Sequence, residues 1–149
     1  GGRIIGEACH YIDLMRFLVG KKITSFQAQK MGNNKSINKT DDKTFIILNF
    51  EDGSHGVIIY LANGSNKFPK ERIEIFTAGK ILQLDNFKKL KGFGWKGFNK
   101  LNLWKQDKGQ LNCINSFINS IQSGVPAIPS NEIFEIAAVT IEIADLLRK

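Results

Sequence analysis

The chain has 149 residues, of which 42% are hydrophobic and 23% are charged, and its formal net charge is +7. Its size is that of one globular domain, and its composition excludes an intrinsically disordered chain. No apolar run reaches the roughly 18 residues that a membrane-spanning helix needs. We therefore expect a single domain, residues 1–149, with no membrane partner.

The cysteines and the net charge bear on the cellular compartment of the protein and on its partners. Cys9 and Cys113 lack the spacing of a metal site or of a disulfide framework, and no secretion signal is visible. This favours a reduced, cytoplasmic protein without a bound metal. The excess of lysine could attract nucleic acid, anionic lipid or an anionic substrate such as a sugar nucleotide. The simpler interpretation is a solvated lysine-rich surface.

The hydrophobic pattern changes its period along the chain. Helical spacing predicts helices over residues 7–19, 107–123 and 130–147. Alternation predicts strands over 23–31, 43–50, 54–62, 72–77 and 81–85, with short strands around a flexible tip in 87–104. A polar loop is expected over 32–42. Strands segregated from helices indicate an α+β fold, with an open, mostly antiparallel or mixed sheet and helices packed on one face.

One motif needs to be rejected. Gly92-Phe-Gly94-Trp-Lys-Gly97 matches the dinucleotide pattern G-x-G-x-x-G. That pattern binds pyrophosphate only between a buried strand and the N-terminus of a helix. Here lysine-rich residues 88–91 precede it and no helical periodicity follows it. We therefore predict that these glycines serve a loop, and that this chain holds no nucleotide by itself.

The same segment has a second possible function, because lysines interleave with its aromatic residues. They are Lys88, Lys89, Lys91, Lys96, Lys100, Lys105 and Lys108. These residue types contact phosphates and stack on bases in nucleic-acid-binding proteins. No recognised DNA- or RNA-binding motif accompanies them, so we do not expect nucleic acid as a partner.

The predicted first helix carries three titratable residues on one flank. At 100° per residue, Glu7 and His10 lie about 60° apart, and His10 and Asp13 are separated by the same angle. Histidine is the side chain best suited to exchange a proton near neutral pH. The structural alternative is that His10 lies at the edge of the core and that Asp13 is solvated beside Arg16.

A family resemblance favours the functional interpretation of His10. The segment from Gly2 to Asp13, with its His10-Tyr-Ile-Asp13 motif, resembles the active-site helix of the glucose–fructose oxidoreductase and inositol dehydrogenase family (Gfo/Idh/MocA). Three further segments resemble one branch of that family in the same order: Tyr60–Gly64, Phe68–Phe76 and Gln106–Gly109. The resemblance covers nearly the whole chain.

The resemblance implies a C-terminal substrate-binding domain of an oxidoreductase that acts on a secondary alcohol of a sugar, cyclitol or sugar nucleotide. NAD or NADP would be bound by an N-terminal Rossmann domain that is absent from this chain, and His10 would handle the proton. The sheet would face a partner subunit in a homo-oligomer. One position departs from the family pattern: Gly6 stands where many members have aspartate, and Glu7 is shifted by one residue.

The remaining candidate residues are assigned to substrate binding. They are Glu7, Asp13, Asn63, Lys67 and Lys70, of which the last three lie on the loop after a long strand, where binding residues gather. A charged solvent loop is the alternative for those three. We expect the isolated chain to be inactive, because hydride chemistry needs the cofactor. The competing function is a non-catalytic interaction or oligomerisation module.

Overall fold

The computed structural model describes residues 2–32 and 43–148, so most of the loop predicted over 32–42 lies outside the described residues. The chain forms two compact units. Unit 1 consists of Gly1–Gly64 and Ile128–Lys149, and unit 2 consists of Ser65–Ala127. No helix among the described residues is both long enough and apolar enough to cross a membrane.

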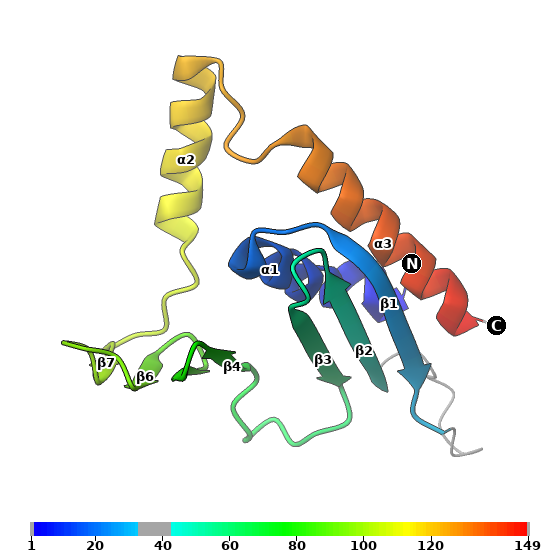
Figure 1. Cartoon of the computed structure of the whole chain (residues 1–149), viewed down its shortest axis with the longest axis horizontal. Helices are drawn as coiled ribbons and strands as arrows, with labels where there is room; N and C mark the ends of the chain where they lie inside the picture. Colours follow the sequence, from blue (N-terminus) through cyan, green and yellow to red (C-terminus); the bar gives the residue numbers. More distant parts are fainter. Residues whose placement is uncertain (1, 33–42, 149) are drawn as a thin grey trace. The chain divides into compact units, whose positions relative to one another are not determined.

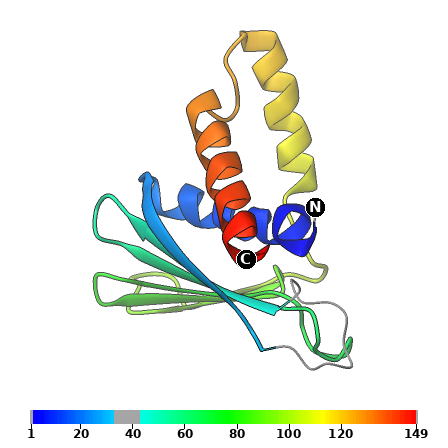
Figure 2. The same cartoon turned by 90° about the vertical axis from the view of Figure 1, so that its right-hand side faces the viewer.

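Unit 1 is a three-stranded antiparallel sheet with two helices on one face (Figures 1 and 2). Its helices are the π-helical turn η1 (Ile4–Ala8), α1 (Cys9–Val19) and α3 (Ser130–Arg148). Its strands, in spatial order, are β1 (Ile23–Lys30), β2 (Lys43–Phe50) and β3 (His55–Leu61). The helices from both ends of the unit therefore cover the same sheet.

The core of unit 1 lies between this sheet and the helices. Along β2, Ile46, Leu48 and Phe50 are buried, whereas Phe45 and Ile47 on the opposite face are exposed. This alternation follows from the two-residue period of a strand. The buried cluster is completed by residues of η1, α1, β3 and α3: Ile4, Ala8, Ile12, Ile58, Ile143, Ala144 and Leu147.

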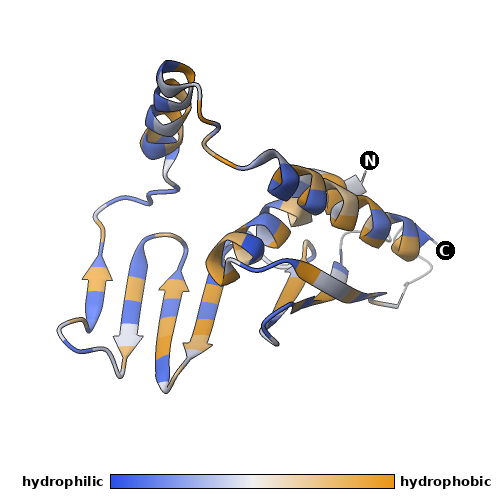
Figure 3. Cartoon of the chain, turned by 45° about the horizontal axis from the view of Figure 1, so that its top comes forward, coloured by the Kyte–Doolittle hydropathy of each residue, from blue (hydrophilic) through white to orange (hydrophobic). Residues whose placement is uncertain are grey.

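Unit 2 is a four-stranded antiparallel meander followed by one helix (Figures 1 and 3). Its elements are β4 (Arg72–Thr77), β5 (Lys80–Asp85), β6 (Lys89–Phe93), β7 (Lys100–Asn102) and α2 (Gln110–Ser123). β6 and β7 confirm the short strands predicted within 87–104. Helix α2 begins three residues later than predicted, directly after Gly109, which adopts a φ of 77°.

The predicted α+β class with antiparallel strands is confirmed. However, the strands do not form the one continuous sheet that the sequence pattern suggested. β3 pairs with β2 and β4 pairs with β5, and the two ladders are separate sheets. The physical reason is local. Each strand pairs with its neighbour in sequence, and the segment 62–71 between β3 and β4 has no strand conformation, so no hydrogen-bonded ladder joins β3 to β4.

The glycines of the rejected dinucleotide pattern shape the β6–β7 hairpin. Gly92 lies within β6, and Gly94 and Gly97 have φ angles of 73° and 77° in the connection to β7. A β-carbon on Gly92 would lie 2.6 Å from the Phe98 ring, so the hairpin packs too closely there for a side chain. A strand, and not a helix, follows the motif. The motif therefore lacks the strand-to-helix setting in which this pattern binds pyrophosphate.

Gly94→Ala is expected to destabilise the protein by about 1–3 kcal/mol, because alanine is strained at positive φ. Its β-carbon would also lie 2.9 Å from the backbone oxygen of Gly79, which cannot move as a side chain would. Urea unfolding followed by circular dichroism measures the loss. Gly64→Ala is the matched control, since nothing lies within 4 Å of a β-carbon there. Equal stability of the two variants would contradict this prediction.

Candidate functional site

The start of unit 1 is a π-helical turn that runs into an α-helix. In η1 the backbone N–H of Cys9 donates to the carbonyl of Ile4, five residues earlier. Such turns occur mostly as single insertions and are frequent at functional sites. Because Glu7 lies in this wider turn, the α-helical angle expected between Glu7 and His10 does not apply. His10 and Asp13 both lie in α1, where the expected spacing of about 60° holds.

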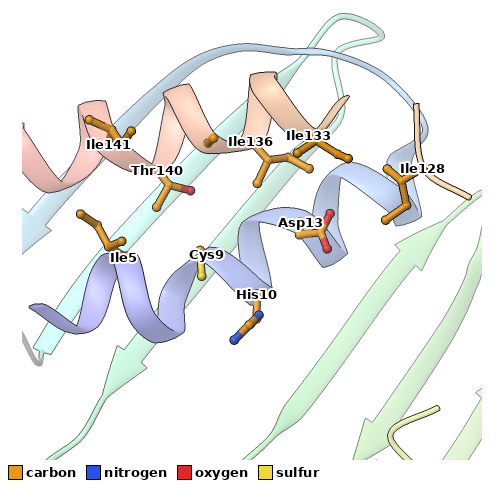
Figure 4. A pocket seen from close by; sticks show the side chains of 10 residues that line it. Ile5, Cys9, His10, Asp13, Ile128, Ile133, Ile136, Thr140 and Ile141 are labelled. Atoms are coloured by element: carbon orange, nitrogen blue, oxygen red, sulfur yellow. The ribbon is translucent and has the colours of Figure 1, made fainter. Parts of the chain in front are cut away.

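A groove of about 430 Å³ runs between α1 and α3 (Figure 4). Its lining is mostly aliphatic: five isoleucines and one alanine contribute, together with Cys9, His10, Asp13 and Thr140. The isoleucines and the alanine are Ile5, Ile128, Ile133, Ile136, Ile141 and Ala137. The fold brings these residues together from η1 and α1 at one end of the chain and from α3 and the segment before it at the other, more than 100 positions away.

His10 and Asp13 give the groove its polar edge. Both side chains are exposed, and Figure 4 shows them on the same stretch of α1, with the His10 ring pointing away from α3 in this view. Within residues 2–32 and 43–148, the exposed His10 ring makes no side-chain hydrogen bond or ion pair. Glu7 is also exposed but does not line the groove.

Two further groups lie deeper in the groove. Thr140 is 4% exposed, and its Oγ1 is buried without a hydrogen-bond partner among the described residues. Cys9 is half-buried, and this burial raises the pKa of its thiol above the usual value. Cys9 is therefore a neutral thiol near pH 7, not an activated nucleophile. Both described cysteines are free.

A buried arginine joins α1 to α3, the two helices on either side of the groove, by ion pairs. The side chain of Arg16, at the C-terminal end of α1, is 6% exposed. Its Nε lies 3.2 Å from Oε1 of Glu135, and its terminal nitrogen lies 3.4 Å from Oε1 of Glu132. The same Glu135 oxygen accepts the backbone N–H of Ile23 at 2.7 Å. One carboxylate thus connects α1, α3 and the first residue of β1.

The structural alternative for the first helix placed a solvated Asp13 beside Arg16. Arg16 is buried and paired with two glutamates of α3. Asp13 is solvated, as that alternative required.

The remaining candidate residues lie on the loop between β3 and β4. Asn63, at the end of unit 1, and Lys67 and Lys70, in unit 2, are all exposed. The loop is shaped by Ser65, whose carbonyl accepts the N–H of Phe68 at 3.0 Å and whose Oγ accepts the N–H of Lys67 at 3.3 Å. The role of these three residues in substrate binding stays a prediction.

No cofactor or metal site is built from the described residues themselves. No group of three or more His, Cys, Asp or Glu side chains among them could hold a metal ion. Both sheets are antiparallel, and the one glycine-rich pattern lies in a hairpin, so these residues do not fit a dinucleotide.

Sequence reasoning missed the contribution of α3 to the groove. Thr140, Ile133 and Ile141 are separated from His10 by more than 120 positions, and no spacing rule links them. One signal was present in the sequence: Thr140 interrupts the otherwise apolar residues 136–141 of α3.

Comparison with known proteins identifies the relatives of this chain. Residues 1–81 match the GFO/IDH/MocA C-terminal domain. No curated protein matches the sequence.

Solved structures with the same fold cover nearly the whole chain. A dehydrogenase from Clostridium difficile is 19% identical with a TM-score of 0.72, and the match covers 96% of this chain and 47% of that one. UDP-N-acetylglucosamine 3-dehydrogenase from Acidithiobacillus ferrooxidans is 17% identical with a TM-score of 0.67, over 91% and 45%. The WlbA dehydrogenase from Bordetella pertussis, in complex with NADH and UDP-GlcNAcA, is 22% identical with a TM-score of 0.58, over 99% and 43%. The chain thus spans less than half the length of these relatives.

Proposed function

This chain belongs to the GFO/IDH/MocA family, whose C-terminal domain it matches over more than half of its length, and from this membership we propose that it is the substrate-binding domain of an oxidoreductase. The proposed protein uses NAD or NADP to oxidise or reduce a secondary alcohol of a sugar, cyclitol or sugar nucleotide. Two relatives support the substrate class, because their names include UDP-linked sugars. We further propose that it acts in the cytoplasm, which free thiols support.

One observation carries this proposal: His10 is exposed at the edge of a groove and is not packed into the core. A histidine there can take a proton from a substrate hydroxyl, or return it, near neutral pH. Asp13, one helical turn later on the same flank, can accept a hydrogen bond from a neighbouring hydroxyl. Cys9 and Thr140 would contact the bound molecule deeper in the groove.

The cofactor needs a separate binding site in this proposal. Because the described residues do not fit a dinucleotide, we assign NAD or NADP to an N-terminal Rossmann domain outside these 149 residues. The length of the solved relatives supports this, since each is more than twice as long as the part that this chain matches. The exposed Ile133 and Ile141, which line the same groove as His10, give such a domain an apolar surface to cover.

The remaining polar candidates complete the proposed substrate site. Glu7 and Asp13 would bind hydroxyl groups, and Asn63, Lys67 and Lys70 would contact the distal part of the substrate. Lysine suits a phosphate or a carboxylate there, which fits a sugar nucleotide.

The purified chain is expected to show no turnover with NADH or NADPH and any sugar nucleotide, because it holds no cofactor. The measurement is absorbance at the nicotinamide band, with a panel of sugar, cyclitol and sugar-nucleotide substrates. The same panel is then assayed with the chain joined to its own N-terminal domain, where turnover is expected. Turnover by the 149-residue chain alone would contradict the assignment of the cofactor to another domain.

A second function, oligomerisation, is favoured by the uncovered face of the sheet in unit 1. Five apolar side chains of β2 and β3 are exposed there, opposite the face that α1 and α3 cover: Phe45, Ile47, Val57, Ile59 and Leu61. None of the five is charged. Because a twofold interface places one patch against itself, an uncharged apolar patch suits a second copy of the same chain. We therefore propose a homo-oligomer that forms through this face.

Ile59→Lys is expected to convert the oligomer to a monomer, because a twofold interface would place two buried lysines close together. Ile59 is 60% exposed, so the substitution leaves the core of unit 1 intact. Light scattering over a concentration series measures the mass. Phe17→Lys, at another exposed apolar position of unit 1, is the control and should not change the mass. A wild-type chain that stays monomeric at high concentration would exclude this interface.

A further inference from the structure

The net charge of the chain is confined to unit 2. Residues 65–127 hold 11 of the 21 basic residues and 4 of the 14 acidic ones, which gives +7, the net charge of the whole chain. Unit 1 therefore holds ten of each and is formally neutral. A lysine-rich composition alone would spread the charge over both units, so this division needs another explanation.

Most acidic groups of unit 2 are already engaged. Glu71 pairs with Lys108 at 2.5 Å, and Glu74 accepts hydrogen bonds from Arg72 and Gln83. These bonds, led by the one from Gln83, hold the pKa of Glu74 below its usual value. Asp107 accepts the backbone N–H of Gly109 at 2.8 Å. Asp85 is the one acid of unit 2 with no such bond.

Three lysines are gathered on one face of the β6–β7 hairpin. Lys89 and Lys91 alternate along β6, and Lys91 lies directly opposite Lys100 of β7. All three are exposed, and none forms an ion pair within the described part of the chain, although Asp85 is the cross-strand neighbour of Lys89. Like charges directly opposite each other destabilise a sheet. An anionic ligand between Lys91 and Lys100 would remove that repulsion.

Two phenylalanines share this face of the sheet. Phe93 follows Lys91 by two residues in β6, and across the strands it is in register with Ile81 and then with Phe76. Phe93 is 53% exposed and Phe76 is 70% exposed, so neither ring is packed into a hydrophobic core. Figure 3 shows hydrophilic and hydrophobic residues alternating along these strands, as this register requires.

We propose that this surface binds single-stranded nucleic acid without sequence preference. The surface, called here the basic–aromatic face, consists of Phe76, Lys89, Lys91, Phe93 and Lys100, and the same register puts Glu74 and Asp85 on this face as well. Lysines that contact phosphates and exposed rings on which bases stack, side by side on an antiparallel sheet, are the elements by which such binding works. The sequence alone argued against this partner because no motif was present; the strand register supplies the missing arrangement. The inference does not depend on the dehydrogenase function.

The test uses the purified 149-residue chain and a fluorescein-labelled 20-nucleotide oligothymidine, with binding followed by anisotropy between about 20 and 200 mM salt. We expect the logarithm of the association constant to fall linearly with that of the salt concentration. Lys91→Gln with Lys100→Gln should make this negative slope shallower by about 1.4, since each phosphate contact on a single strand contributes roughly 0.7 to its magnitude. Lys21→Gln with Lys22→Gln removes the same charge from unit 1 and should leave the slope unchanged.

Stacking is tested separately from charge. Phe93→Leu and Phe76→Leu should each weaken binding by about threefold to tenfold without changing the salt slope, because stacking is not ionic. Phe17→Leu, an exposed ring of unit 1, is the control. The proposal is overturned if both lysine pairs have equal effects, if the phenylalanine variants bind like the wild type, or if duplex DNA or phosphatidylserine vesicles bind as tightly as the single strand. A wild-type chain that does not bind the oligonucleotide at any of these salt concentrations would overturn the proposal as well.

Discussion

His10→Ala is expected to lower kcat by about 10²–10⁴ in the protein that contains both this chain and its cofactor domain, because a general acid/base contributes about that factor. The imidazole lies at the edge of the groove, exposed and without a side-chain partner in the described residues, so its loss removes a proton acceptor and leaves packing unchanged. Steady-state kinetics with the best substrate of the panel measures the effect. The KM should change much less than kcat.

The control for this experiment is the other histidine of the chain. His55 is exposed on β3 and its Nδ1 lies 2.8 Å from Oδ1 of Asn49, on the sheet and away from the groove. His55→Ala should retain the wild-type kcat. If His10→Ala also retains it, the histidine is not the proton-transfer group, and the proposed function loses the observation that carries it.

Arg16→Ala is expected to destabilise the folded chain by about 2–4 kcal/mol. Removing one partner of a fully buried ion pair costs about 3–5 kcal/mol, because the other charge is left without compensation. Here the side chains of Glu135 and Glu132 are 16% and 30% exposed, so water lowers that cost. Among the described residues, Glu135 would then keep just the hydrogen bond from the Ile23 N–H. Urea denaturation at neutral pH gives the free energy of unfolding, with circular dichroism as the signal.

An exposed ion pair of the same unit provides the comparison. Arg148 lies 2.9 Å from Asp145, but both side chains are more than half exposed. Exposed pairs contribute less than about 1 kcal/mol, so Arg148→Ala should be nearly neutral. Similar losses in the two variants would show that Arg16 acts through its general charge and not through the buried contacts that join α1, α3 and β1.

The elements of the fold could be predicted because their signals are local. Residues 43–50 alternate with a period of two, and β2 has those bounds. The spacing of apolar residues likewise gave the first helix its end at Val19, where Gly20 adopts a φ of 69°. The π-helical turn before Cys9 was not foreseen, because five residues are too few to show a period that differs from that of an α-helix.

Only the part of the candidate site that lies on α1 could be predicted from the sequence. His10 and Asp13 share a flank of one helix, and their spacing is sufficient to place them together. Cys9 and Thr140 face the same groove from different helices, and Arg16 meets Glu135 across 119 positions of sequence. Such pairs depend on how α3 packs on α1, and the spacing of residues within either helix does not predict that packing.

The sequence by itself determined the class of fold and the antiparallel strands, because these follow from the residue spacing within each element and from the order of the elements. It placed His10 and Asp13 on one flank of a helix but left the exposure of His10 open. Tertiary structure decided the division into two units, the groove between α1 and α3, and the burial of Arg16. It also placed Lys91 opposite Lys100 and all the net charge in one unit. These features depend on contacts between segments distant in sequence, whose pairing is set by packing and register and not by any local pattern.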